Sequence, residues 1–356
     1  MARPPVRNWA PMLGVVALIS CGESTAPSAP ATTAGPTLAE TSHPWTPNSW
    51  TSKAALPGYS LTGDQFFGVD GVAAAVANNS AGQPIIYALG GTDRHNGTGY
   101  EVQAYNLATN TWTRKNGRLF AFNTNGVGKI GGKLYISGGY TYDNGAYAFA
   151  VAFPYLWAYD VATDRMIRRA DMPKATGDGV TGVINGKLYV VPGTCSGEYW
   201  PDPHYCDQPT IRQLFRYDPV ANVWTTLARP PHFHVNAAAG VIHGKFYVAG
   251  GGNAYLDVYD PWSNTWKTLA PIPAPRAHAA GAIQNGKLWV IGSNGSNRNT
   301  YAYDPLTNGW TTKAPLPQGG ATDAAAPLSD SQSHILVIGG GPGTLDHPAT
   351  SELYTP

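Results

Sequence analysis

The stretch NGKLWVIG at residues 285–292, followed by YDPLTNGW at residues 303–310, is the clearest copy of a pattern that recurs along most of the chain. Its first half opens with Asn285 and Gly286, a pair that readily takes the positive φ angles of a two-residue hairpin turn, and continues as a short apolar strand. Its second half predicts a strand ending at Tyr303, a turn rich in Pro and Asn, and a further strand. One copy therefore predicts a small antiparallel sheet.

Five other stretches follow the same order of features: an apolar strand ending at or near a Gly pair, a later tyrosine and, in most copies, a tryptophan. The tyrosines of the six copies are Tyr105, Tyr159, Tyr217, Tyr259, Tyr303 and Tyr354. They are spaced by about 40 to 60 residues, the length of one supersecondary unit in many repeat proteins. In this order and spacing the features resemble kelch repeats over about residues 46–356. The resemblance implies an all-β fold, a β-propeller with one four-stranded blade per repeat.

The segment NSWTSKAALP at residues 48–57 precedes the first repeat and closely matches NGWTTKAPLP at residues 308–317, which ends the fifth repeat. The sixth repeat, by contrast, has no strand after Tyr354. We therefore predict that residues 48–57 complete the last blade and close a six-bladed kelch-type propeller. Closure removes the terminal sheet edges that would otherwise invite pairing with another chain.

The repeated aromatic residues and glycines have a structural interpretation, because they recur at the same place in each unit. We expect the Trp and Tyr side chains to pack between blades, although Met166 replaces the Trp of the second unit. The Gly pairs are expected to allow close backbone approach or positive φ. Function is then expected in the connections, where the repeats differ.

The first residues of the chain carry the features of an export signal. Arg3 and Arg7 form a basic start, and a short apolar run, too short to span a bilayer, follows them. The run ends in LISC at Cys21, which resembles a bacterial lipobox, whose cysteine is lipidated. The alternative is an ordinary signal peptide with an incidental cysteine.

These features divide the chain into three parts. We expect a lipoprotein signal peptide over residues 1–21, a tether rich in Ser, Thr, Ala and Pro over residues 22–46, and the propeller over residues 47–356. The protein is then an extracytoplasmic lipoprotein of the bacterial cell envelope. Its contact with the membrane is expected only through the lipid anchor at Cys21.

The charge of the chain excludes some classes of partner. The formal net charge is +1, and only 13% of residues are charged. The chain has no excess of basic residues of the kind that nucleic-acid-binding proteins carry. We therefore expect it to bind no nucleic acid. We expect a monomer whose partner is a protein or a glycan.

Polar and aromatic residues of the irregular connections are the candidates for a ligand-binding rim. Aromatic rings can stack on sugars or peptides, and amides, carboxylates and basic groups can form hydrogen bonds with them, although such residues are also ordinary turn formers. The candidates are Arg94, His95, Tyr142, Asp143, Glu198, Tyr199, Trp200, His232, His234, Arg276, His278 and Arg298.

The longest departure from the repeat is an insert in the third unit. Cys195 and Cys206 flank an aromatic- and proline-rich segment over residues 196–205. In an exported protein the two cysteines are expected to form a disulfide, worth about 2–3 kcal/mol for so short a loop. The stapled insert is either a ligand-contacting ridge or a long loop made resistant to proteolysis.

Three histidines in the connections between blades raise the question of a metal. On a strand His232 and His234 would share a face, and His278 occupies nearly the same point as His234 one repeat later. Three histidines on one rim could bind a metal. No cluster of Cys, Asp or Glu converges with them in the sequence, so we expect a polar rim with no metal and no cofactor.

Two enzymes resemble the chain at the level of fold. Galactose oxidase is a kelch-type propeller with a copper site, but none of its site residues can be transferred to this sequence. A periplasmic sialic-acid mutarotase shares the blade count and export, and it implies a carboxylate and an arginine, for which Glu198 and Arg212 could serve. No local motif supports that assignment. We therefore expect a surface-tethered binding module, with a carbohydrate-active enzyme at the channel mouth as the alternative.

Overall fold

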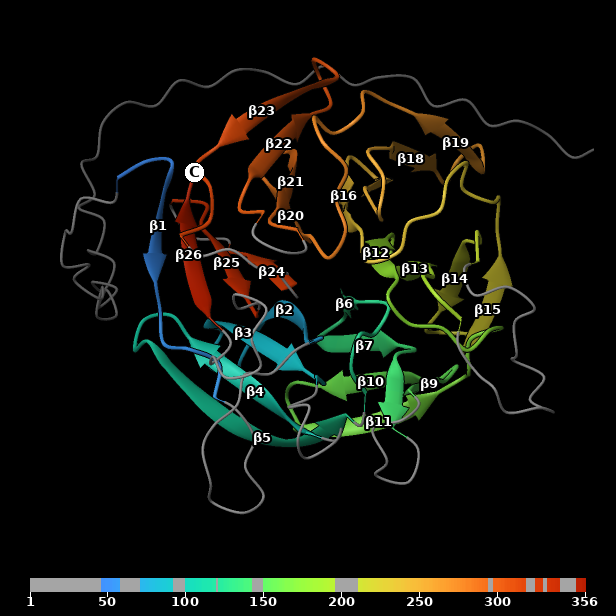
Figure 1. Ribbon diagram of the computed structural model, residues 1–356. Coiled ribbons are helices and arrows are strands. Elements are labelled where there is room, and N and C mark those ends of the chain that lie inside the picture. The colour runs from blue at the N-terminus through green and yellow to red at the C-terminus, as the bar shows by residue number, and fades with distance from the viewer. Residues whose placement is uncertain are drawn as a thin grey trace, which may run out of the picture. The chain divides into compact units, whose positions relative to one another are not determined.

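The computed structural model describes residues 46–57, 71–91, 100–119, 121–142, 150–195, 211–293, 297–317, 324–328, 332–339 and 350–356. Within these ranges the regular elements are β-strands, and six four-stranded antiparallel sheets stand around a common axis (Figure 1). The innermost strands contact one another in a closed circuit, β2–β6–β12–β16–β20–β24 and back to β2. The predicted six-bladed β-propeller is confirmed.

The blades follow one another in chain order. Blade 1 holds β2 (Ala73–Asn78), β3 (Pro84–Leu89), β4 (Tyr100–Asn106) and β5 (Thr111–Leu119). Blade 2 holds β6 (Val127–Ile130), β7 (Lys133–Ser137), β10 (Leu156–Asp160) and β11 (Arg165–Arg169), with an added hairpin of β8 (Tyr140–Tyr142) and β9 (Ala150–Ala152). Blade 3 holds β12 (Val180–Ile184), β13 (Lys187–Val191), β14 (Phe215–Asp218) and β15 (Val223–Thr226).

The remaining blades complete the ring. Blade 4 holds β16 (Ala238–Ile242), β17 (Lys245–Ala249), β18 (Leu256–Asp260) and β19 (Thr265–Thr268). Blade 5 holds β20 (Ala280–Gln284), β21 (Lys287–Ile291), β22 (Thr300–Asp304) and β23 (Gly309–Lys313). Blade 6 holds β24 (Ala324–Pro327), β25 (Ile335–Ile338), β26 (Ser351–Thr355) and β1 (Ser49–Ser52).

The outer strand of blade 6 comes from the N-terminal side of the propeller. Strand β1 pairs antiparallel with β26, and Trp50 lies opposite Tyr354. The repeat therefore continues across the two ends of the propeller sequence, because Trp50 and Tyr354 stand in the same relation as Trp310 and Tyr303 in blade 5. The predicted closure by residues 48–57 is confirmed.

The Asn-Gly turns take the expected backbone conformation. Asn285 and Gly286 have φ angles of 52° and 69°, and Asn185 and Gly186 have 49° and 70°. Two successive positive φ angles match the right-handed twist of the flanking strands. Each turn therefore fixes the register of the first two strands in its blade.

The repeated Tyr, Asn and Trp residues tie each blade to its predecessor. In blade 4 Tyr259 donates a hydrogen bond to Asn264 Oδ1 (2.8 Å), which also accepts from the Ala228 N–H of blade 3 (3.0 Å). Trp266 Nε1 donates to the Ala228 carbonyl (2.7 Å). We call this arrangement the interblade clamp, because it holds both backbone groups of one alanine in the neighbouring blade.

The same clamp recurs in four other blades. The clamping triplets and their alanines are Tyr105, Asn110 and Trp112 on Ala54; Tyr217, Asn222 and Trp224 on Ala170; Tyr303, Asn308 and Trp310 on Ala270; and Tyr354, Asn48 and Trp50 on Ala314. The expected packing role of these residues is confirmed.

Blade 2 departs from the clamp where the sequence departs from the repeat. Asp164 replaces the asparagine and accepts hydrogen bonds from Tyr159 (2.8 Å) and from the backbone N–H of Asn116 and Gly117 in blade 1. A Cβ on Gly117 would lie 2.6 Å from the Tyr159 ring, so the glycine permits this close approach. The Met166 side chain has no N–H that could replace the tryptophan Nε1. The contact with blade 1 is made instead through the Asp164 carboxylate.

The Gly pairs serve both expected purposes. Gly138 has a φ of 61°, and a Cβ there would lie 2.0 Å from the Thr176 carbonyl oxygen. The N–H of Gly139 donates to that same carbonyl across the blade boundary (2.9 Å). The pair thus allows the second strand of one blade to bond directly to the connection that leads into the next blade.

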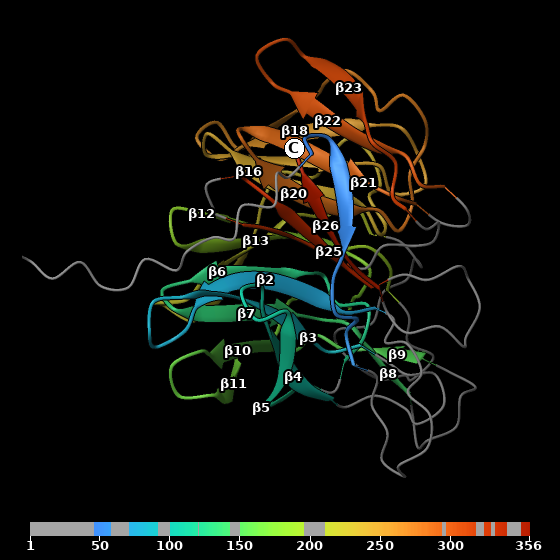
Figure 2. The same ribbon diagram turned by 90° about the vertical axis from the view of Figure 1, so that its left-hand side faces the viewer.

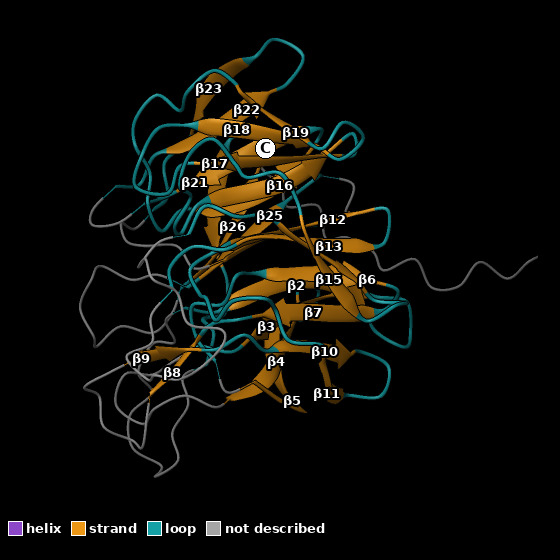
Figure 3. Ribbon diagram, turned by 90° about the vertical axis from the view of Figure 1, so that its right-hand side faces the viewer, coloured by secondary structure: helices purple, strands orange, loops and turns teal. Residues whose placement is uncertain are grey.

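The connections fall on two opposite faces, because neighbouring strands are antiparallel. The loop face, as we name it, carries the connections between the second and third strands of each blade and those joining blades, such as residues 250–255 and 269–279. The turn face carries tight turns such as residues 219–222 and 261–264. Figures 2 and 3 show the two faces from the side, with β8 and β9 on the loop face.

The described residues begin after the predicted leader and tether. The signal peptide over residues 1–21, Cys21 and nearly all of the tether over residues 22–46 lie outside the described ranges, so they stay predictions. Among the described residues there is no helix with the length and apolarity that crossing a bilayer requires.

Candidate functional site

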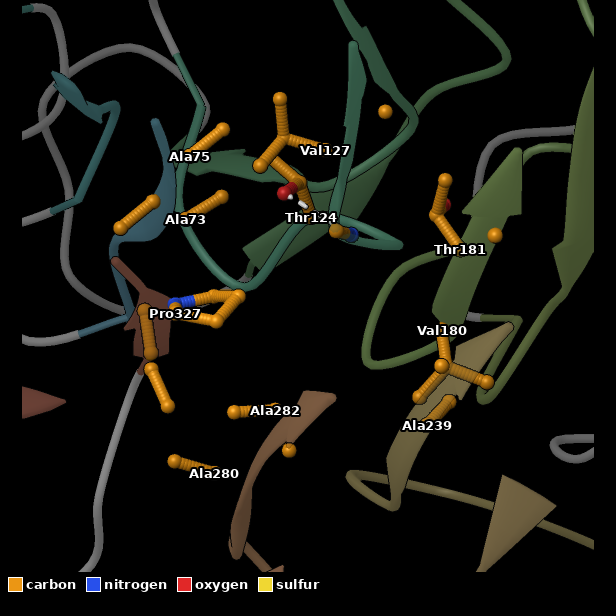
Figure 4. Close-up of a pocket in the computed structure, with 18 of the residues that line it drawn as sticks. Ala73, Ala75, Thr124, Val127, Val180, Thr181, Ala239, Ala280, Ala282 and Pro327 are labelled. Atoms are coloured by element: carbon orange, nitrogen blue, oxygen red, sulfur yellow. Dashed lines mark hydrogen bonds between the residues drawn. The ribbon is translucent and has the colours of Figure 1, made fainter. Parts of the chain in front are cut away.

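A cavity of about 550 Å³ runs along the axis of the propeller (Figure 4). Side chains from all six inner strands line it, and most are small. The labelled ones are Ala73, Ala75, Thr124, Val127, Val180, Thr181, Ala239, Ala280, Ala282 and Pro327. The cavity is therefore a channel lined mostly by small side chains, with both polar and apolar surface.

The chemistry of this channel is limited. The lining residues that the structure describes include Lys129 and His278 but no Asp or Glu. The predicted enzyme alternative implies a carboxylate beside an arginine at the channel mouth. The described lining residues include neither, so the geometry does not favour this alternative.

An incomplete ring of backbone hydrogen bonds, four among the described residues, lies at the loop-face mouth of the channel. The N–H of Asn123, Asp178, Asn236 and His278 each donates to the carbonyl of the equivalent residue one blade earlier, at 2.6–2.9 Å, beginning with Gly71. All five residues have positive φ. The mouth is thus held rigidly by main-chain contacts, and its side chains are free to vary between blades.

His278 lies on this ring, and its position corrects the predicted alignment. His278 and Asn236 have φ angles of 52° and 51°, and both stand two residues before an inner strand. Asn236 Nδ2 donates to His278 Nε2 (3.1 Å). The equivalent of His278 is therefore Asn236, and the equivalent of His234 is Arg276. The predicted match of His278 with His234 is wrong by two residues.

His232 and His234 converge on an aspartate that the sequence reading missed. The segment over residues 227–237 is not a strand, so the predicted reason for a shared face is wrong. The loop nevertheless brings His232 Nδ1 and His234 Nε2 each to 3.0 Å from Asp257 Oδ2. Thr268 donates to the other oxygen (2.7 Å), and Asp257 is fully buried.

The hydrogen bonds favour the ionised form of the Asp257 carboxyl group. Burial raises the pKa of Asp257, but hydrogen bonds from His234, Thr268 and His232 outweigh it and hold the pKa below its ordinary value. His234 also faces the Gly250 carbonyl through Nδ1 (2.7 Å), where only an N–H can bond. The two histidines, Thr268 and Asp257 thus form a buried polar cluster that anchors the 231–236 loop.

This anchored loop and the neighbouring 250–255 connection each carry an exposed aromatic ring. Phe233 is 46% exposed and Tyr255 is 44% exposed. Tyr255 stacks on His232 with ring centroids 3.5 Å apart, and His232 is itself held by Asp257. Asn253 Nδ2 donates to the Phe233 carbonyl (2.9 Å). Both rings are therefore presented to solvent in a fixed arrangement.

Arginines lie beside two exposed aromatic rings of the loop face, Phe233 and Tyr155. The Arg212 guanidinium carbon lies 5.8 Å from the Phe233 ring centroid, and Arg212 Nη1 donates to the Pro231 carbonyl (2.6 Å). In blade 2 Tyr155, at the position equivalent to Tyr255, is 37% exposed and lies under Arg168 at 3.4 Å. Blades 2 and 4 thus share one feature on the loop face, an exposed tyrosine directly before the third strand.

The other predicted rim residues fall into four groups. His234 and Arg276 are each 1% exposed, so they lie beneath the loop face and not on it. Arg298 is exposed and donates to the Pro317 carbonyl (2.8 Å). Tyr142 belongs to β8. The remaining candidates, Arg94, His95, Asp143, Glu198, Tyr199 and Trp200, lie outside the described residues.

Arg276 stands out among the buried residues. Its guanidinium carbon lies 4.8 Å from the Tyr301 ring centroid, and Nη1 donates to the Pro275 carbonyl (3.1 Å). Nε and Nη2 make no hydrogen bond to the described residues. Burial lowers the pKa of Arg276. The planar guanidinium group of Arg276 packs over the Tyr301 ring, beneath the connection between blades 4 and 5.

The cysteines and histidines singled out in the sequence can be placed only in part. Cys195 is buried, whereas Cys206 lies outside the described residues, so the pairing stays a prediction. Within the described ranges no three His, Cys, Asp or Glu side chains are grouped so that they could hold a metal ion. His278 bonds to Asn236, while His232 and His234 bond to Asp257.

Comparisons with known proteins find the kelch motif in part of the chain. The Kelch motif model matches residues 177–231 and 234–273, which span blades 3 and 4. The chain is 29% identical over 216 residues to the Kelch-like protein terF of Aspergillus terreus, covering 58% of this chain and 43% of that protein. It is 28% identical over 212 residues to the human Kelch-like protein 23, covering 59% of this chain and 33% of that protein. The chain thus spans less than half the length of these curated relatives.

A solved structure agrees with the fold. The structure of YjhT superposes with a TM-score of 0.64 at 18% identity, and the match covers 83% of this chain and 96% of that one. At this identity the likeness concerns the fold alone. It supports the same ring of blades, and the chemistry of the loop face has to be argued from this chain's own residues.

Proposed function

We propose that the chain is a kelch-repeat β-propeller that acts as a binding module and takes a protein or glycan ligand on its loop face. The observation that carries the proposal is the pair of exposed rings, Phe233 and Tyr255, fixed on blade 4 by His232, Asp257 and Asn253. Aromatic side chains dominate the binding energy of many interfaces.

The fixed arrangement of these rings matters as much as their exposure. Binding ordinarily costs about 0.5–1.5 kcal/mol for each flexible side chain that becomes immobilised. Tyr255 is already stacked on His232, and the loop carrying Phe233 is already tied to Asp257 and Asn253. Much of this ordering cost is therefore met before a ligand arrives. Sugar rings and peptide side chains both stack on such surfaces, so both ligand classes fit.

The proposal is tested with a glycan and peptide array probed by the propeller from Thr46 onward. We expect ligands that bind the unaltered protein and lose at least about tenfold in affinity with Phe233→Ala or Tyr255→Ala. Leu306→Ala, on the turn face, is the matched control and is expected to bind normally. Array ligands that bind both loop-face variants with unchanged affinity would place the site elsewhere.

We also propose that the module is tethered to the bacterial cell envelope through lipidated Cys21. The support is the order of features in the sequence: a basic start, a short apolar run, LISC, and a tether of small residues. Metabolic labelling with a palmitate analogue is expected to label the protein and not Cys21→Ser. Equal labelling of the two, or none of either, would overturn the tethering proposal and leave the loop-face proposal unaffected.

A further inference from the structure

The turn face carries the most exposed apolar side chains of the described residues. Val220 is 95% exposed, Trp262 is 97% exposed and Leu306 is 88% exposed. Single exposed apolar residues are common on protein surfaces and need no explanation. These three, however, occupy the same place in three consecutive blades, two residues after the aspartate that ends the third strand.

The local turn geometry directs these side chains away from the protein. The N–H of Val220, Trp262 and Leu306 donates to Oδ1 of Asp218, Asp260 and Asp304, respectively, at 2.9–3.0 Å. The backbone of each turn is thereby fixed, and the side chain stands almost wholly in solvent. Blades 1 and 2 have Ala108 and Ala162 at this place, so the large apolar residues are confined to blades 3 to 5.

The chain enters the propeller on this same face. Asn48 directly precedes β1 and takes the place of Asn308 in blade 5, accepting hydrogen bonds from Tyr354 (2.7 Å) and the Ala314 N–H (2.8 Å). The asparagine of each clamp belongs to a turn of the turn face. Asn48 therefore marks an entry point of the chain on the turn face at blade 6, which is next to blade 5.

We infer that the turn face rests on the lipid surface to which the chain is anchored, with Trp262, Leu306 and Val220 inserted at the headgroup boundary. The inference rests on the proposed lipidation of Cys21. Three side chains that project equally from three blades fit a flat, extended partner. Tryptophan favours the boundary between lipid and water, because its ring is apolar and its N–H is polar.

The proposed tether raises the effective concentration of the turn face at the membrane surface, so that even a weak contact with lipid forms. About 25 residues between Cys21 and the propeller have a root-mean-square span of roughly 28 Å if flexible. An effective concentration in the millimolar range follows for a tether of this kind. The insertion of three side chains is therefore sufficient to orient the propeller, even where it would not recruit a free protein.

The charges on the turn face are compatible with lipid contact. Lys187, Lys245 and Lys287 each form an ion pair with the aspartate of the neighbouring turn, Asp218, Asp260 and Asp304. The pairs leave little net charge beside the apolar side chains. The consequence for the whole molecule is that the loop face points away from the membrane, toward ligands.

The test uses the lipidated chain in vesicles of phosphatidylethanolamine and phosphatidylglycerol, with no other protein present. A nitrobenzoxadiazole probe is placed on Ser263→Cys, next to Trp262, or on Arg298→Cys on the loop face. Lipids carrying a doxyl quencher are expected to quench the probe at 263 at least about twofold more than the probe at 298. The chain without an added cysteine gives the background signal.

The contribution of the tryptophan is measured in the same vesicles. Adding Trp262→Ser to the 263 variant is expected to reduce the quenching, while co-flotation of the protein with the vesicles persists through the anchor. Equal quenching at 263 and 298, or quenching at 263 that Trp262→Ser does not change, overturns the inference. Loss of co-flotation in the unaltered chain shows that the anchor itself is absent, and the inference then falls with it.

Discussion

Asp257, Glu352 and Gln103 occupy one structural position in three blades, two residues before the repeat tyrosine on the third strand. All three are buried, at 0%, 4% and 1% exposure. Their equivalents in the other blades are Trp157, Phe215 and Tyr301. A polar side chain here needs a partner, and each carboxylate finds a hydroxyl on the adjacent outer strand, Thr268 for Asp257 and Ser52 for Glu352.

Replacing Asp257 tests the buried polar cluster. Asp257→Asn is expected to destabilise the propeller by about 2 kcal/mol at pH 7, because it removes a charged acceptor from the hydrogen bonds with His232, His234 and Thr268. The pKa of Asp257 is lowered in the fold, so its contribution is full above the unfolded value of about 3.9 and is lost as the pH falls through the folded value. Urea unfolding at pH 7 and in acid measures the gap between variant and wild type, which should narrow in acid.

A matched control is the more exposed carboxylate of Asp171, which pairs with Arg168. Asp171→Asn is expected to cost less than about 1 kcal/mol at either pH. A cost for Asp257→Asn no larger than that of the control would show that the histidine cluster does not stabilise the loop.

Replacing Glu352 is expected to change stability at pH 7 in the opposite direction to Asp257→Asn. Burial raises its pKa, against a smaller lowering by the Ser52 hydroxyl, so the charged form is disfavoured in the fold. Its contribution to stability is present below the unfolded pKa of about 4.3 and is lost as the pH rises through the folded value. Glu352→Gln is therefore expected to raise the melting temperature at pH 7 and to leave it unchanged near pH 4. A lower melting temperature at pH 7 would contradict this account.

The sequence contains a signal for these residues. Asp257 stands two positions before Tyr259, and residues two apart on a strand share a face, so an aspartate there lies on the same buried face as the repeat tyrosine. The repeat alignment could have identified it. The pairing with His232 and His234 was less accessible, because it depends on the path of a loop that has no regular structure.

The N-terminal strand β1 is the element that connects the first and last blades. It pairs with β26, and Asn48 and Trp50 clamp Ala314 of blade 5. Ala54, just after it, is clamped in turn by blade 1. The segment around β1 therefore bonds to both neighbours of blade 6, namely blade 5 and blade 1.

Deleting residues 48–57 tests this role. We expect a marked loss of melting temperature for the whole propeller, because blade 6 loses its outer strand and two interblade clamps lose members. Thermal unfolding followed by circular dichroism measures it. An unchanged melting temperature would refute closure by this strand.

A single substitution examines one hydrogen bond of the same element. Trp50→Phe keeps the ring but removes the bond from Nε1 to the Ala314 carbonyl (2.9 Å), and it is expected to cost about 1 kcal/mol. Trp262→Phe is the control, since this tryptophan is 97% exposed and belongs to no clamp. Equal stability of the two variants by urea unfolding would show that the clamp bond adds nothing.

For the molecule as a whole, the sequence predicted the scaffold more fully than the site. Regular repeats carry the same information several times, so the blade number, the closure and the roles of Trp310 and Gly286 could be read from spacing and turn chemistry. The exposed pair of Phe233 and Tyr255 comes from two connections that do not repeat. Their proximity follows from the register of β17 and β18 and from the buried Asp257, which no local motif reveals.

The most direct test of the central claim is the footprint of a bound ligand by amide hydrogen exchange. With the ligand that the array identifies, we predict slower exchange in the loop-face segments over residues 231–236 and 250–255, and unchanged exchange in the turns over residues 219–222, 261–264 and 305–308. Protection confined to the turns, or to the inner strands that line the channel, would contradict the assignment of binding to the loop face.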